Sequence, residues 1–173
     1  MEPAGNIEFR DMTEAYLGAA AALYNHYVLE TTATFHTAPL SPWDMRELLF
    51  FDDGRFRSFA ILDGGAFCGY LILSAYKNRE AYRTTAEVTV YLDAARTGRG
   101  IGTKALRHAQ TYAQTNGFHA LLGIVCGENA ASIRMFEKNG YFRCGLLKEV
   151  GVKFGRKLDV VLFEKIIGLD TET

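Results

Sequence analysis

Three glycines alternate with other residues in the stretch "TGRGIG", residues 97–102, which separates an apolar, strand-like run from a helix-like pattern. These glycines are Gly98, Gly100 and Gly102. Arg96, Arg99 and Lys104 add positive charge around them. The N-terminus of a helix carries unpaired N–H groups and partial positive charge, so it attracts anions. A plain turn needs only one or two glycines, and we therefore favour a loop that binds a phosphate group.

Two common phosphate-binding motifs do not account for this loop. The P-loop pattern GxxxxGK[ST] fails because Gly102 is followed by Thr-Lys, and no glycine stands five residues before it. The dinucleotide fingerprint GxGxx[GA] is matched literally by Gly100, Gly102 and Ala105, but seven residues separate it from the apolar run that ends at Leu92. That fingerprint belongs in a tight turn directly after the first strand of its fold, and too little chain follows here to complete such a domain.

The composition indicates one globular domain. The 173 residues are 49% hydrophobic and 23% charged, which suits a single domain over residues 1–173 with a core at about 7–167. The net charge of −1 provides no basic field for nucleic acid. Neither a signal-peptide pattern nor a membrane-spanning apolar run is present, so we expect a cytoplasmic protein. Cys68, Cys126 and Cys144 stand apart in apolar contexts, which predicts reduced core thiols and no metal site.

Alternating strand and helix patterns flank the loop. Apolar and β-branched runs predict strands at residues 7–10, 58–62, 67–75, 85–92 and 120–126, and two closing strands within 141–150 and 157–166. Helical spacing predicts helices at about 13–29, 42–51, 101–115 and 130–139. Ser41, Pro42 and Asp44 together make a strong helix start. The order β-α-α-β-β-β-α-β-α-β-β predicts a mixed α/β sheet.

Four blocks of the sequence carry a resemblance to a known family. They are "LYNHYVLETTATF" (23–35), "YKNREAYRTTAEVTVYL" (76–92), the glycine loop, and "GENAASIRMFEKNGYFRCGLLKEVGVKFGRKLDV" (127–160). Together they resemble the GNAT superfamily of acetyl-CoA-dependent N-acetyltransferases, and within it the phosphinothricin / methionine sulfoximine (sulfone) acetyltransferases. The resemblance spans about residues 7–165. The loop departs from the family pattern [QR]xxGx[GA] at its first position, where Thr97 stands.

The resemblance implies a GNAT fold, a mostly antiparallel sheet with one parallel pair near the coenzyme site. It implies a homodimer that uses acetyl-CoA, and no metal, to acetylate the α-amino group of a small amino-acid-like substrate by direct transfer in a ternary complex. The amine must first lose a proton, and Glu87 matches the family's general base. Partial burial could raise the pKa of this carboxyl. From the residues alone, Glu87 is equally compatible with a strand glutamate that faces solvent.

The resemblance also implies which residues contact the coenzyme. They are Val90, Tyr91, Leu92, Gly98, Arg99, Gly100, Ile101, Gly102, Thr103, Asn129 and Lys138. Backbone N–H groups of Val90 and Leu92 would hold the pantetheine arm and the thioester carbonyl, and such donors stabilise an oxyanion. Asn129 is also compatible with an ordinary helix cap, and Lys138 with a solvated lysine near a helix end. Phe136 stands where the family often has Tyr or His, and it carries no acidic proton for the leaving thiolate.

For the acceptor, the resemblance implies contacts from seven residues. They are Phe35, Lys77, Asn78, Arg79, Glu87, Val88 and Thr89. Lys77 and Arg79 match cationic positions that face an anionic substrate, and Arg suits bidentate carboxylate or phosphinate recognition. As a bare pattern, "YKNRE" favours a solvated loop. The segment 153–160, "KFGRKLDV", resembles one that lies near the family's dimer contact and completes the acceptor site.

Two other functions remain open at the level of sequence. The first is a GNAT enzyme with a different acceptor, either a peptide N-terminus or a polyamine. An acidic acceptor groove would favour a polyamine, whereas Lys77 and Arg79 favour an anion. The second is a non-catalytic domain that binds acetyl-CoA as a sensor. Thr97 and Phe136 leave that possibility open, and the presence of Glu87 argues against it.

Overall fold

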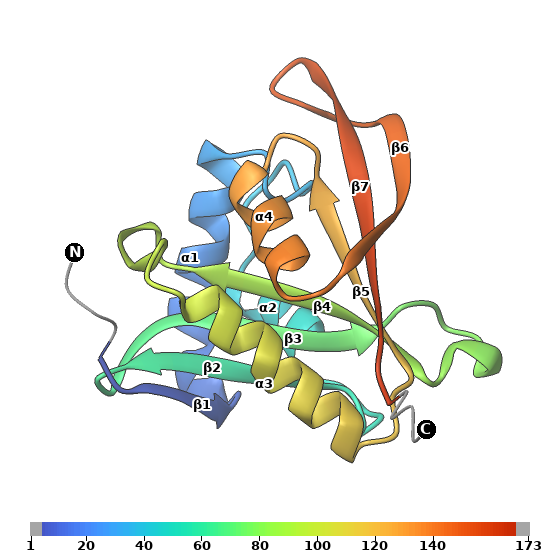
Figure 1. Cartoon of the computed structure of the whole chain (residues 1–173). Coiled ribbons are helices and arrows are strands. Elements are labelled where there is room, and N and C mark those ends of the chain that lie inside the picture. The colour runs from blue at the N-terminus through green and yellow to red at the C-terminus, as the bar shows by residue number, and fades with distance from the viewer. Residues whose placement is uncertain (1–4, 169–173) are drawn as a thin grey trace.

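In the computed structural model, which describes residues 5–168, the strands form one mixed sheet (Figure 1). The ends of the predicted domain, 1–4 and 169–173, lie outside the described residues. The strands are β1 (Ile7–Asp11), β2 (Arg57–Asp63), β3 (Ala66–Ala75), β4 (Thr85–Leu92), β5 (Ala120–Cys126), β6 (Phe142–Lys153) and β7 (Arg156–Ile166). Over the described chain they are ordered β1-β2-β3-β4-β5-β7-β6. β4 and β5 are parallel and the other neighbours antiparallel, as predicted.

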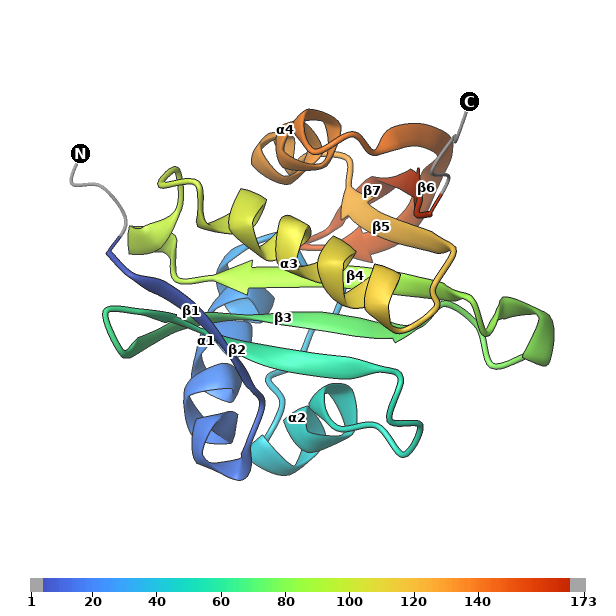
Figure 2. The same ribbon diagram turned by 60° about the horizontal axis from the view of Figure 1, so that its bottom comes forward.

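Helices cover both faces of this sheet. They are α1 (Leu17–Glu30), α2 (Pro42–Leu49), α3 (Ile101–Thr115) and α4 (Ala130–Lys138), with short 3₁₀ turns at Glu14–Tyr16, Glu80–Tyr82 and Ala94–Arg96. Figure 2 shows α1 and α2 on one face and α3 and α4 on the other. None of the helices in residues 5–168 is both long and apolar enough to span a membrane.

Local sequence signals explain where several elements begin and end. At the start of α2, the Ser41 hydroxyl accepts from the Asp44 N–H, and the Asp44 carboxylate accepts from the Ser41 N–H, as a capping box requires. The β2–β3 hairpin turns at Gly64 and Gly65, whose φ angles of 61° and 84° favour glycine. The predicted bounds of α3, β4 and β5 match the structure. The first helix differs, because Glu14–Tyr16 forms a 3₁₀ turn before the α-helix begins.

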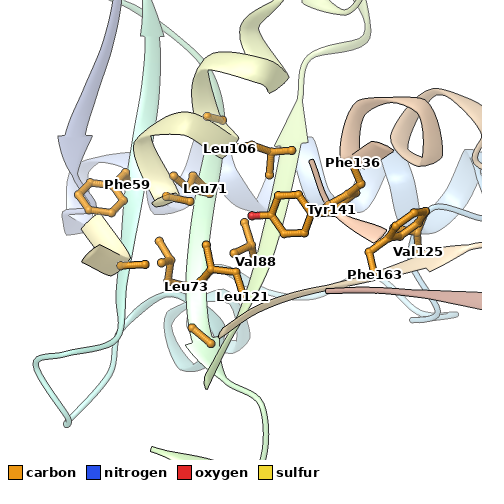
Figure 3. Close-up of a cluster of buried hydrophobic side chains, with 14 of the residues drawn as sticks. Phe59, Leu71, Leu73, Val88, Leu106, Leu121, Val125, Phe136, Tyr141 and Phe163 are labelled. Atoms are coloured by element: carbon orange, nitrogen blue, oxygen red, sulfur yellow. The ribbon is translucent and has the colours of Figure 1, made fainter. Parts of the chain in front are cut away.

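Two apolar clusters lie on opposite sides of the sheet. The larger lies beneath α3 and α4 and includes the side chains in Figure 3, among them Phe59, Leu71, Leu106, Phe136 and Phe163. The smaller lies beneath α1 and α2. Full burial of each large apolar side chain contributes about 1.5–3 kcal/mol. The sheet is therefore fastened on both faces at β2, β3 and β4, the strands that lead to the glycine loop.

The parallel pair separates soon after it begins. β4 and β5 are paired only from Thr85 opposite Ala120 to Glu87 opposite Leu122. Beyond this point β5 remains paired with β7, and β4 with β3. From Val88 onward, the edge of β4 that faces β5 is therefore not covered by that strand.

One predicted core cysteine is on the surface. Cys68 and Cys126 are buried free thiols, but Cys144 is exposed. Cys144 falls where the register between β6 and β7 shifts between Arg143 and Gly145. β6 is the edge strand of the sheet, and such an irregularity leaves an extra residue outside the regular pairing. The prediction that Cys144 is a core thiol, which was based on its apolar neighbours, is therefore wrong.

Candidate active site

A cavity of about 420 Å³ lies between the separated halves of β4 and β5. The residues of β4 that line it are Val88–Leu92. The glycine loop and the first turn of α3 form one end, and α4 forms the opposite wall. Its lining includes Tyr27, Ala33, Val88, Thr89, Val90, Tyr91, Leu92, Thr97, Gly98, Gly100, Ile101, Gly102, Thr103, Ile124, Val125, Cys126, Asn129, Ser132, Arg134, Met135, Phe136 and Lys138. Every residue predicted to contact the coenzyme lines this cavity except Arg99.

The three glycines of the loop have two different structural roles. Gly98 and Gly100 have φ angles of 74° and 79°, a region that other residues rarely adopt. A Cβ on either would meet open space, so their requirement is conformational. Gly102 lies in the first turn of α3, where a Cβ would come within 2.4 Å of the Met135 sulfur. It therefore permits close packing of α3 against α4.

The glycine loop leads into α3 without a side-chain cap. Gly100 occupies the N-cap position and has no side chain that could accept from the first turn. The first N–H groups of an α-helix have no acceptor within the helix. Ile101, Gly102 and Thr103, which carry the first of these N–H groups in α3, line the end of the cavity. This end of the cavity is suited to a phosphate group.

The sequence predicts that both arginines of the loop present their charge to a bound anion, but in the structure both are paired with a carboxylate. Arg96 and Arg99 each form an ion pair with the same carboxylate oxygen of Asp63, at 3.0 Å from Arg99 Nη1. Asp63 ends β2, and its side chain is only 4% exposed. Its charge offsets one of the two positive charges. The pair thus fastens the loop to the β2–β3 hairpin and leaves one net positive charge.

Glu87 lies where β4 and β5 separate, and it is the last residue of β4 opposite β5. Its strand neighbours Ala86 and Val88 point into the core beneath α3, so Glu87 points to the opposite face. It is half-buried, and burial raises the pKa of its carboxyl above the ordinary value. Glu87 does not line the cavity itself, but the adjacent Val88 does. A carboxyl in this position can accept a proton beside the cavity.

Tyr27 and Tyr91 line the cavity beside α1, and Tyr24 packs against Tyr91. The Tyr27 hydroxyl donates to the Leu92 carbonyl oxygen over 2.6 Å, which ties α1 to the end of β4. Tyr24 and Tyr27 each lie 5.2 Å from Tyr91, measured between ring centroids. Burial raises the pKa of all three hydroxyls, so they are protonated at neutral pH. Sequence reasoning included Tyr91 but missed the other two, since helical spacing alone predicts only that they are apolar.

Asn129 and Phe136, the two residues at α4 that the resemblance singles out, have different surroundings. Asn129 caps the helix, its Oδ1 accepting from the Ser132 N–H over 3.1 Å, and it also lines the cavity. The two readings of Asn129 are therefore compatible. Phe136 is buried with its ring against Gly123, where a Cβ would lie 2.5 Å from the ring. No hydroxyl or imidazole is present at that position to supply a proton.

The predicted acceptor residues are not all together. Lys77, Asn78 and Arg79 are exposed on the β3–β4 connection and do not line the cavity. The Lys77 ammonium lies over two rings of its own loop, 5.0 Å from the Tyr76 centroid and 5.7 Å from that of Tyr82. Phe35 lies in the loop after α1, packs against Gly151 and does not line the cavity either. Val88 and Thr89 line the cavity directly.

Within residues 5–168, no group of three or more His, Cys, Asp or Glu side chains could hold a metal ion. The cavity supplies backbone N–H groups, a helix N-terminus and an amide, and these donors suit phosphate and carbonyl groups. The donor set therefore fits a long, phosphate-bearing ligand whose other end reaches toward Glu87.

Known proteins resemble this chain over nearly its whole length. A model of the acetyltransferase (GNAT) family matches residues 20–141. A phosphinothricin N-acetyltransferase of Streptomyces coelicolor is 33% identical over 169 residues, 95% of this chain and 99% of that protein. An L-methionine sulfoximine/L-methionine sulfone acetyltransferase of Salmonella typhimurium is 30% identical over 161 residues, 91% of this chain and 92% of that protein. The structure of a phosphinothricin acetyltransferase from Sinorhizobium meliloti in complex with AcCoA has a TM-score of 0.89 at 31% identity, covering 96% and 91% of the two chains.

Proposed function

The chain belongs to the acetyltransferase (GNAT) family and is an acetyl-CoA-dependent acyltransferase, and we propose that it acetylates the α-amino group of a small amino-acid-like acceptor. The observation that carries this proposal is the position of Glu87, a half-buried carboxyl at the point where β4 and β5 separate. The acceptors named for two relatives, phosphinothricin and methionine sulfoximine or sulfone, support the choice of acceptor class.

The coenzyme would lie along the cavity. Its pyrophosphate would accept from the N–H groups at the start of α3, beside Gly98 and Gly100, and its pantetheine arm would run along the uncovered edge of β4. Backbone N–H groups of Val90 and Leu92 would hold the thioester carbonyl and the oxyanion that develops from it. Asn129 and Lys138 would contact the coenzyme from α4.

Direct transfer requires a neutral amine, because an amino acid is an ammonium ion at neutral pH. Glu87 would take that proton, through a water molecule, before the amine attacks the thioester carbon. The new C–N bond forms as the C–S bond breaks, and CoA leaves as a thiolate. Attack leaves a positive charge on the acceptor nitrogen, which must lose a second proton to become an amide. Because Phe136 has no proton to give, that proton, directly or through water, would go to the thiolate. Lys77 and Arg79 would attract an anionic acceptor from outside the cavity.

The experiment is CoA release with acetyl-CoA and a panel of amines. The panel contains phosphinothricin, methionine sulfoximine, methionine sulfone, common amino acids, spermidine and a short peptide. Turnover with the first three alone would support the proposal. Turnover only with the peptide or spermidine would replace the acceptor class. Tight binding of acetyl-CoA with no CoA release from any amine would instead indicate a sensor domain.

We also propose that the protein is a cytoplasmic homodimer. The hairpin formed by β6 and β7 exposes a set of large apolar side chains, and apolar patches of this kind mark protein interfaces. The set is Leu146, Leu147, Val150, Val152 and Phe154, each at least 44% exposed, together with Ile124 of β5 at 43%.

A double variant tests the dimer. Leu146→Glu with Val150→Glu should convert a dimer to a monomer in light scattering after size-exclusion chromatography, because paired carboxylates cannot be buried in an apolar interface. Trp43→Glu is the control, since Trp43 is 69% exposed on α2 and should leave the mass unchanged. A wild-type chain that is monomeric at micromolar concentration would contradict the proposal.

A further inference from the structure

The loop at residues 31–36 is fastened at Thr34 from two directions. The Lys153 ammonium donates to the Thr34 carbonyl oxygen over 2.8 Å, across 119 residues of sequence. The Tyr24 hydroxyl lies 2.6 Å from the Thr34 hydroxyl and 2.5 Å from His36 Nδ1. Thr34 itself is 5% exposed. The loop thus has a buried anchor point between α1 and the end of β6.

Lys153 is buried without a carboxylate partner among the described residues. It is 3% exposed, and no ion pair joins it to an acidic side chain of residues 5–168. Its ammonium lies 3.4 Å from the Tyr27 carbonyl oxygen in the last turn of α1. The negative end of the helix dipole is therefore beside it. A buried cation is costly unless it is satisfied, so these two carbonyl groups hold Lys153 in place.

Lys153 is not the only contact between the β6–β7 hairpin and this loop. Gly151 packs against the Phe35 ring so closely that a Cβ would come within 2.2 Å of it. On β7, the second strand of the hairpin, Arg156 pairs with Glu128 through two N–H groups, at 2.5 and 3.0 Å. Glu128 also accepts from Thr32, at 3.4 Å. The last two contacts are exposed and contribute little, so Lys153 and Gly151 carry most of the attachment.

This loop forms part of the wall of the cavity. Ala33 lines the cavity, as does Tyr27, whose hydroxyl is bonded to the Leu92 carbonyl of β4. A shift of the loop would therefore move part of the wall of the cavity that Val88 and Thr89, the residues that follow Glu87, also line. Phe35, one of the predicted acceptor contacts, is 39% exposed and packs against Gly151 of the hairpin.

We propose that Lys153 is a positioning residue for the acceptor amine: it fixes the loop at residues 31–36 against the β6–β7 hairpin and so sets the acceptor side of the cavity. This inference rests on the proposed function, since it assigns the loop to the acceptor. The glycine-loop end of the cavity is fastened separately, because Arg96 and Arg99 of that loop pair with Asp63. Lys153 acts through the loop and touches neither reacting group.

The test compares Lys153→Met with Lys148→Met. Lys148 is an exposed lysine of the same hairpin that pairs with Asp159, so it controls for the loss of a charge. In Lys153→Met, we expect the KM for the acceptor amine to rise about 10-fold or more, with the KM for acetyl-CoA changed less than about 3-fold, because misplacement of one substrate wall acts on that substrate. Lys153→Arg keeps the cation and should recover part of the loss.

A second readout does not depend on the acceptor. Hydrogen exchange followed by mass spectrometry should show faster exchange in residues 31–36 of Lys153→Met than in the wild type or Lys148→Met. If Lys153→Met does not fold, Gly151→Ala replaces it, because the added methyl would displace Phe35 with the lysine retained.

The outcomes separate the two proposals. Unchanged exchange in residues 31–36 would overturn the attachment, whatever the activity. Faster exchange with an unchanged amine KM, or with equal changes in both KM values, would overturn the role in positioning the acceptor. If no amine of the panel is acetylated by the wild type, the proposed function fails, and faster exchange would still establish the attachment that the inference requires.

Discussion

Turnover of a Glu87→Gln variant is expected to fall at least about 100-fold, the usual contribution of a positioned general base. Glutamine keeps the size of the side chain but cannot take a proton from the acceptor ammonium. The binding of acetyl-CoA should be unchanged, because Glu87 does not line the cavity. The measurement is kcat for CoA release at saturating acetyl-CoA and amine, with a Kd for acetyl-CoA from calorimetry.

The pH dependence of the wild type gives a sharper form of this prediction. A base works when deprotonated, so kcat should decrease as the pH falls through the pKa of Glu87. Burial raises that pKa above the ordinary value, which places the decrease at a higher pH than for an exposed glutamate. The Glu87→Gln variant should lack this part of the profile.

The free energy of unfolding of Glu87→Gln distinguishes loss of the general base from loss of the folded structure. Because the pKa of Glu87 is raised in the folded protein, its contribution to the free energy of unfolding is fully present below the ordinary pKa and is lost as the pH rises through the raised one. Glutamine cannot ionise, so the variant should be no less stable than the wild type at pH 7–8. Glu80→Gln, at an exposed position of the preceding connection, is the matched control for activity. A Glu87→Gln enzyme with full turnover would remove Glu87 from this role.

An Asp63→Ala variant is expected to lose about 3 kcal/mol of stability and to bind acetyl-CoA more weakly. Removing one partner of a buried ion pair typically costs 3–5 kcal/mol, and the lower end applies because the Arg96 side chain is 35% exposed. Arg96 and Arg99 would both lose the carboxylate that they share, and the start of the glycine loop would lose its attachment to β2. Denaturant unfolding measures the loss of stability.

The KM for acetyl-CoA measures the weaker binding of the coenzyme by Asp63→Ala. We expect this KM to rise about 10-fold, because the N–H groups at the start of α3 would no longer be held in one arrangement. The KM for the amine should change less. Asp52→Ala is the control, since Asp52 is an exposed aspartate with no ion pair in the described part of the chain. Equal stability and equal acetyl-CoA KM in the Asp63 variant and wild type would show that this ion pair does not support the loop.

Most of the helices and strands, and the glycine loop at one end of the cavity, could be predicted from the sequence because their signals are local. The capping box at Ser41 and Asp44 lies within one helical turn, and the glycine turn at Gly64 and Gly65 lies between two adjacent strands. The glycine loop is likewise six consecutive residues, the last two of which begin α3. Order along the chain and backbone preference determine such features before any distant contact forms.

What the tertiary structure decided were the contacts between distant residues. Asp63 and Arg99 are 36 residues apart, and the sequence suggested that both arginines serve the anion, because nothing near them in the chain revealed a buried carboxylate. Lys153 and Thr34 are 119 residues apart, and a lysine between exposed Val152 and Phe154 gave no sign of burial. A charge is buried where distant elements happen to supply its partners, so its environment is settled only when β2 meets the glycine loop and β6 meets the end of α1.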